Sequence, residues 1–138
     1  MRLLALCLAA SLAAPAVVYA QQDLTGTYRD QQSELMLQKQ GEKYEFSLLA
    51  RSGDNFGGSI GVIQFQNQKA TFVDDELPEC ELTFSIQAAA ESSRGQTPIK
   101  VDQKGDSFDC GFGLGVYAGG EYKFVNKPVN FKDHELGN

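Results

Sequence analysis

The sequence lacks the residues on which most enzyme sites are built. It contains no tryptophan and one histidine, His134, which lies four residues before the end of a polar tail. It has no H-E-x-x-H, G-x-S-x-G, P-loop or paired C-x-x-C motif. Hydrolytic triads and Cys–His pairs need a histidine held beside a nucleophile, and a loosely ordered tail is a poor place to hold one. We therefore expect no catalytic residue, no metal ligand and no cofactor, and we assign the serines to turns and strand surfaces.

Basic residues are scarce. The 12 Lys and Arg residues stand against 18 Asp and Glu residues, which gives a formal net charge of −6 at pH 7. Nucleic-acid binding depends on contacts of Lys and Arg with phosphate, so this composition argues against a nucleic-acid partner. The negative charge suits a basic protein partner, and it also promotes solubility.

Long apolar runs are missing except at the N-terminus. One basic residue, Arg2, precedes an apolar run that ends at Leu12, and small residues precede a cleavage position after Ala20. We predict that residues 1–20 are a signal peptide and that residues 21–138 form one domain in the periplasm or outside the cell. The mature chain keeps 11 basic and 18 acidic residues, so its charge is 11 − 18 = −7. No second apolar segment predicts a membrane span in that chain.

Only three cysteines occur, and one of them, Cys7, lies in the predicted signal peptide. The remaining two, Cys80 and Cys110, most simply form one disulfide in an exported domain. A bond that closes a loop of about thirty residues stabilises a fold by about 3.5 kcal/mol in the chain-entropy model. A metal-binding or catalytic pair of thiols is disfavoured because no histidine lies near either cysteine.

The remainder of the chain reads as short strands separated by turn residues. The clearest strand is residues 80–87, where Cys80, Leu82, Phe84 and Ile86 alternate with polar residues. The same pattern predicts further strands at residues 26–29, 33–39, 44–48, 60–65, 70–73 and 99–103. We therefore predict an all-β fold: a single small antiparallel barrel or sandwich of about seven or eight strands, with one disulfide and a loosely ordered tail from residue 129.

The stretch CGFGLGVYAGG, residues 110–120, alternates apolar residues with glycine. Its G-x-G-x-x-A match does not indicate a nucleotide site, because no helix follows it. Taken as a strand, it would have one apolar face and one nearly bare glycine face. Two interpretations stay open: the glycines allow the barrel to close tightly under an aromatic such as Phe131, or they form a platform for a partner with Tyr117 as its anchor.

The candidate binding residues combine loop acids with aromatics outside the predicted core. We select a glycine-rich loop at residues 52–58, an acidic loop that begins at residue 74, and the glycine stretch. A calcium site in the acidic loop is disfavoured, because the D-x-[DN]-x-[DN]-G spacing is missing and a solvated loop explains the acids. The candidates are Asp54, Asn55, Phe56, Asp74, Asp75 and Tyr117.

Three segments carry a resemblance: CELTF at residues 80–84, VDQ at residues 101–103, and CGFGLGVYAGGEY at residues 110–122. Together they resemble a pattern in small secreted all-β proteins of Gram-negative bacteria, and the resemblance implies export and fold but no activity. In plan the chain is also similar to periplasmic lysozyme inhibitors, which are small, exported, acidic and all-β. Their S-G-x-x-Y loop is matched by Ser52–Gly–Asp–Asn–Phe56 except at the tyrosine, so we transfer no inhibitory residue.

Two functional hypotheses follow. The first is a non-enzymatic binding protein, an inhibitor or immunity-type protein that acts on a cell-wall hydrolase or toxin, with a basic hydrolase as its partner. The second is a small β-barrel that carries an apolar ligand inside a cavity lined by aromatic side chains. The fold alone does not decide between them.

Overall fold

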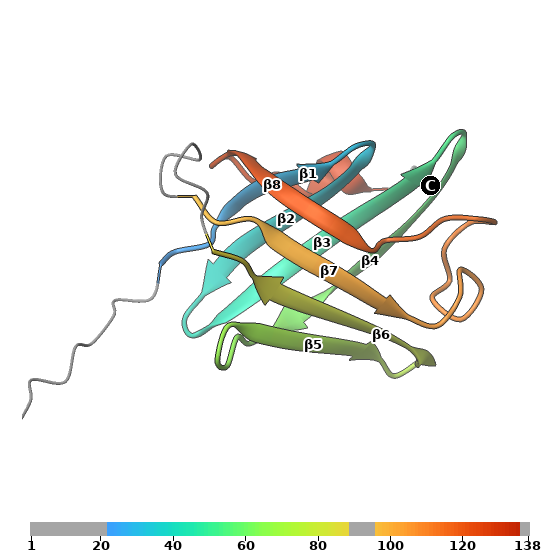
Figure 1. Cartoon of the computed structure of the whole chain (residues 1–138), viewed down its shortest axis with the longest axis horizontal. Helices are drawn as coiled ribbons and strands as arrows, with labels where there is room; N and C mark the ends of the chain where they lie inside the picture. The colour runs from blue at the N-terminus through green and yellow to red at the C-terminus, as the bar shows by residue number, and fades with distance from the viewer. Residues whose placement is uncertain (1–21, 89–95, 136–138) are drawn as a thin grey trace, which may run out of the picture.

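The computed structural model describes residues 22–88 and 96–135 (Figure 1). The signal peptide predicted for residues 1–20 lies outside the described residues, as does the end of the tail at 136–138. No helix in the described part of the chain is long and apolar enough to cross a membrane.

Eight antiparallel strands form one sheet that curls into a nearly closed barrel (Figure 1). Consecutive strands pair with each other except β4 and β5, and β1 also pairs with β8, which gives the order β4-β3-β2-β1-β8-β7-β6-β5. The prediction of an all-β fold is therefore confirmed, and the architecture is a barrel. The strands are β1 (Gly26–Asp30), β2 (Ser33–Gln40), β3 (Lys43–Ser52), β4 (Asn55–Ile63), β5 (Lys69–Asp74), β6 (Leu77–Ile86), β7 (Ile99–Lys104) and β8 (Gly120–Asn126).

The barrel is closed at β4 and β5 by side chains, because within the described residues no ladder of hydrogen bonds joins these strands. Phe72 of β5 lies directly over Gly61 of β4, so close that a Cβ on Gly61 would sit 2.3 Å from the ring. The same ring packs edge-on against Phe46, with centroids 4.9 Å apart. Phe72 therefore fills the gap between β4 and β5, which we call the seam. Glycine at position 61 leaves room for its ring.

Aromatic rings fill the interior of the barrel. The rings of Phe46 and Phe84 are fully buried, with centroids 5.0 Å apart. The hydroxyls of Tyr28 and Tyr122 donate to the carbonyls of Leu24 and Ala118, each at 2.7 Å. Burial raises the pKa of both tyrosines, so their hydroxyls stay protonated as donors. These aromatic side chains point into the barrel, and the contacts between their rings form part of the hydrophobic core.

The glycine stretch is not the strand that its alternation predicts. Residues 105–119 form a long loop, and β8 begins only at Gly120. The physical reason is that Gly111 and Gly115 adopt φ of 66° and 70°, conformations that turn the chain out of an extended path. Cys110 is buried and bonded to Cys80, as predicted, but Leu114 points into solvent.

The start of β4 also differs from the sequence prediction, which placed residues 52–58 in a loop. Ser52 pairs with Asn55 and Arg51 pairs with Phe56, so the hairpin continues to a two-residue turn. Glycines in β4 lower the strand signal of this segment in the sequence, whereas backbone pairing with β3 decides its structure.

The C-terminal segment packs on the outside of the barrel. A short 3₁₀ helix, η2 (Phe131–His134), lies against β3, and the hydroxyl of Thr27 in β1 donates to the carbonyl of Pro128 at 2.8 Å. Outward-facing Met36 and Leu49 are buried, although they do not belong to the core inside the barrel. The part of the predicted loose tail that the structure describes therefore covers a second, outer apolar layer.

Candidate functional site

One end of the barrel gathers four connections, because alternate turns of a meander lie at the same end. They are the β1–β2 turn, the β3–β4 turn, the β5–β6 turn and the loop of residues 105–119 (Figure 1). We call the segments 30–33, 52–55, 74–77 and 104–120, together with Phe56, the loop end. The disulfide fixes its longest loop to β6 at Cys80.

All six residues predicted as binding candidates lie at the loop end, although the sequence separates them by up to 63 positions. Asp54 lies in the β3–β4 turn, and Asn55 Nδ2 donates to the carbonyl of Leu114 at 3.0 Å. This bond joins the hairpin that carries Phe56 to the loop that carries Tyr117. The hairpin and the loop therefore form one connected surface.

Asp74 and Asp75 lie in the β5–β6 turn, at the same end but in a separate group. The carboxylate of Asp74 accepts the backbone N–H of Glu76 at 2.8 Å, which stabilises the turn itself. Among the described residues, no hydrogen bond or ion pair joins Asp74 or Asp75 to Phe56 or Tyr117. The structure thus brings four of the candidates together and places the two acids in a separate turn at the same end of the barrel.

Large apolar side chains at the loop end are open to solvent. Phe56 is 48% exposed, Tyr117 57% and Leu114 69%, and Phe108 in the same long loop is 69% exposed. Exposed aromatic residues grouped in this way are typical of partner-binding surfaces. Leu114 was not predicted from the sequence, because the strand interpretation turned it inward, and neither was Phe108, because a single phenylalanine in a polar turn gives no signal.

The charge of the loop end is strongly negative. Within the segments 30–33, 52–55, 74–77 and 104–120, Lys104 is the one basic residue, and Arg51 adjoins them with its guanidinium 5.8 Å from the ring of Phe56. Described segments at the opposite end of the barrel hold Asp23 and Glu42 against Lys43, Lys69 and Lys127. The two ends of the barrel therefore differ in charge, because acids predominate at the loop end and not in the described segments of the opposite end. The seven acids of the loop end are Asp30, Asp54, Asp74, Asp75, Glu76, Asp106 and Asp109.

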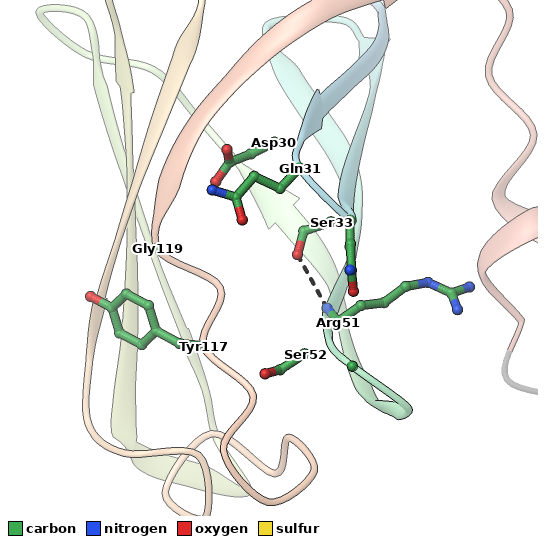
Figure 2. Close-up of a pocket in the computed structure, with 9 residues that line it drawn as sticks. Asp30, Gln31, Ser33, Arg51, Ser52, Tyr117 and Gly119 are labelled. Carbon is green, nitrogen blue, oxygen red and sulfur yellow. Dashed lines mark hydrogen bonds between the residues drawn. The ribbon is translucent and has the colours of Figure 1, made fainter.

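A pocket of about 300 Å³ opens at the loop end between the first two hairpins and the long loop (Figure 2). The backbone N–H of Arg51 donates to Ser33 Oγ at 3.1 Å, which ties β3 to the β1–β2 hairpin along one wall. Of the residues predicted from the sequence, only Tyr117 lines this pocket. The remaining residues that line the pocket come from three distant segments and share no motif: Asp30, Gln31, Gln32, Ser33, Arg51, Ser52, Gly53 and Gly119.

A second exposed apolar surface lies outside the loop end. Ile60 and Val62 point outward from β4, and Val73 points outward from β5 across the seam. This surface lacks the acids of the loop end, and it is the weaker candidate for a basic partner.

His134 does not lie in a loose tail, as the sequence suggested, but is 9% exposed and held between two side chains. Its Nδ1 lies 2.8 Å from Ser47 Oγ, and its Nε2 lies 2.9 Å from Glu34 Oε1. Arg29 Nε pairs with the other oxygen of Glu34 at 2.6 Å. The expectation that no histidine stands beside a nucleophile is therefore wrong, because docking of η2 on β3 brings residue 134 to residue 47.

This Ser–His–Glu set has the residue types of a hydrolytic triad, but its arrangement differs. In a triad the serine bonds Nε2 and the acid bonds Nδ1, whereas here the two nitrogens are exchanged. Ser47 is 1% exposed beneath η2, so a substrate reaches its hydroxyl only if that helix leaves. The geometry fits a latch that holds the C-terminal segment on the barrel.

The electrostatics of the latch favour an ionised Glu34. Partial burial alone would raise the pKa of this carboxyl, but hydrogen bonds from Arg29 and His134 outweigh it and hold the pKa below its ordinary value. A charged carboxylate thus accepts from both neighbours at neutral pH.

Among the residues that the structure describes, no group of three or more His, Cys, Asp or Glu side chains is arranged to hold a metal ion. The carboxylates of Asp106 and Asp109 instead accept backbone N–H groups of their own turn at 2.8–2.9 Å. They shape the loop that carries Phe108.

Comparison of the chain with protein-family models, with curated proteins and with solved structures found no match.

Proposed function

We propose that the protein is a non-enzymatic binding protein of the periplasm or extracellular space. In this proposal the loop end binds a basic protein, as an inhibitor or immunity-type protein acting on a cell-wall hydrolase or toxin. The observation that carries it is the coincidence of seven acids with exposed Phe56, Leu114 and Tyr117 at one end of a disulfide-linked barrel.

The two kinds of residue support the proposal in different ways. Acids concentrated on one surface steer a basic partner toward it and orient the encounter. Exposed aromatic and aliphatic side chains then supply the area whose burial holds the complex together. Because the disulfide and the Asn55–Leu114 bond already fix the loops, less conformational entropy is lost on binding.

The alternative, a carrier of an apolar ligand, requires a cavity among the inward side chains. The rings of Phe46, Phe72 and Phe84 are in contact there, with centroids 4.9 and 5.0 Å apart. These contacts favour binding on the outside of the barrel over binding within it.

The test is binding to a panel of basic and acidic peptidoglycan hydrolases, with inhibition of wall hydrolysis as a second readout. We expect tight binding to at least one basic enzyme, weakened at least tenfold by Asp54→Lys combined with Phe56→Ala. The matched control, Glu42→Lys in the β2–β3 turn at the opposite end, makes the same charge change and should leave affinity unchanged.

Two results would contradict the proposal. One is equal weakening by the loop-end and opposite-end variants, because binding would then depend only on net charge. The other is a discrete small-molecule mass on the protein in native mass spectrometry, with no hydrolase bound, which would support the carrier.

A further inference from the structure

The pocket at the loop end contains a carboxylate without a partner. Asp30, the last residue of β1, lies against the backbone of Gly120, where a Cβ would sit 1.8 Å from Asp30 Oδ2. Among the described residues, its carboxylate makes no hydrogen bond or ion pair. Asp30 is half-buried and lines the pocket beside Gln31 (Figure 2).

Arg51, the basic residue of the lining, does not neutralise the carboxylate of Asp30. Arg51 contributes its backbone to the wall, but its guanidinium points away from Asp30 and lies 5.8 Å from the ring of Phe56 (Figure 2). The pocket therefore presents a net negative charge, and the surrounding acids of the loop end add to it. Such a site repels anions and attracts cations.

Tyr117 borders the pocket on the side of the long loop, across from Arg51 (Figure 2). Tyr117 is folded onto the backbone of Gly119, where a Cβ would sit 2.3 Å from the ring, so the ring is supported at the pocket edge. Because 57% of the residue stays exposed, the ring is available to a ligand. An aromatic face attracts a cation placed over it, and guanidinium groups stack on such faces.

Neutral acceptors complete the lining. The hydroxyl of Ser52 and the side-chain amide of Gln31 border the same space as Asp30 (Figure 2). A guanidinium carries five N–H donors in a plane and suits one carboxylate flanked by neutral oxygens. A volume of about 300 Å³ lies at the small end of ligand pockets and accommodates one long side chain.

We propose that this pocket receives a single arginine side chain of the basic partner, with its guanidinium on Asp30 and its stem against Tyr117. The inference rests on the proposed function and names the group that the loop end recognises. Phe56 and Leu114, at the neighbouring hairpin and loop, then contact the apolar surface around that arginine.

The test uses N-acetyl-arginine amide as a probe, titrated into the mature, oxidised protein and followed by amide chemical shifts in NMR. We expect saturable shifts confined to residues 30–33, 51–53 and 117–119. N-acetyl-citrulline amide has nearly the same shape without the charge, and it should produce no saturable shift at the same concentrations. Asp30→Asn should weaken probe binding at least tenfold, whereas Glu42→Gln at the opposite end should leave it unchanged.

Exposed Tyr117 allows a second variant that does not disturb the core. Tyr117→Ala should weaken probe binding several-fold while thermal unfolding stays at the wild-type temperature. Equal shifts with the citrulline probe, or shifts by neutral N-acetylglucosamine at the same residues, would overturn the arginine assignment.

The two proposals fail separately. If the loop end binds a basic hydrolase and Asp30→Asn leaves that affinity unchanged, the arginine pocket is wrong and the proposed function stands. If the arginine probe binds as expected but no basic hydrolase binds, the pocket assignment is supported and the inhibitor function is wrong.

Discussion

At the scale of single residues, the most informative side chain is His134, because it joins the C-terminus to the barrel. Its ring lies between Ser47 and Glu34, and Glu34 also pairs with Arg29. Each of these polar groups is satisfied by the next, which is the condition for burying them without loss of stability. The latch therefore depends on the charge state of Glu34.

Stability should fall in acid because of Glu34. Its pKa is lower in the folded protein than the ordinary value of about 4.3 expected when unfolded, so ionised Glu34 stabilises the fold above that value. The contribution is lost as the pH falls through the folded pKa. Urea unfolding from pH 6 to about pH 3 should show a smaller acid loss for Glu34→Gln than for the wild type, and a stability lower by about 1 kcal/mol at pH 7. Glu42→Gln is the control, and an unchanged acid slope in Glu34→Gln would contradict the assignment.

At the scale of elements, what could be predicted depended on whether the decisive contacts were local. Alternation along residues 80–86 is a property of one strand, and it correctly gave β6 and the buried side of Cys80. Alternation along residues 110–118 looks the same in sequence but belongs to a loop, since its glycines turn the chain. His134 and Ser47 are 87 positions apart, and no local pattern indicates that η2 docks on β3.

The seam between β4 and β5 should be sensitive to a single methyl group. Gly61→Ala places a Cβ where the Phe72 ring now lies, and overpacking of this kind costs about 1–3 kcal/mol. The combined variant with Phe72→Leu should lose less stability than the sum of the two single changes, because the smaller side chain leaves room. Thermal and urea unfolding of the four proteins test this, and strict additivity would show that Phe72 does not fill the seam.

The C-terminal segment should act as a structural element. Ending the chain after Lys127 removes η2 and exposes Met36, Ser47 and Leu49, at a cost of about 2–5 kcal/mol from the apolar burial alone. Ending it after Glu135 retains the latch and should be neutral. Urea midpoints of the two truncations compare them directly, and equal midpoints would mean that the segment adds no stability.

At the scale of the whole molecule, the up-and-down order of the strands determines where the charged turn residues gather, as well as which side chains face the core. Every second connection of an up-and-down barrel lies at one end, so acids in the turns at residues 54, 75–76 and 106–109 gather there although they are far apart in sequence. A correct list of strands would have been enough to predict this clustering. The pocket required more, because Asp30, Ser52 and Tyr117 meet only through the geometry of three loops.

The charge asymmetry predicts how a basic partner should associate. Charges screened beyond about 10 Å at 0.1 M salt lose their steering effect, so the association rate should fall at least about tenfold between about 0.02 M and about 0.5 M NaCl. The dissociation rate should change less, because buried apolar contacts of Phe56 and Leu114 are not screened. Stopped-flow or surface-based kinetics measure both rates. Asp54→Asn with Asp75→Asn should flatten the salt dependence, whereas Glu42→Gln should not. An association rate independent of salt would place the recognition surface elsewhere, with the apolar strand surface at Ile60 and Val62 as the next to test.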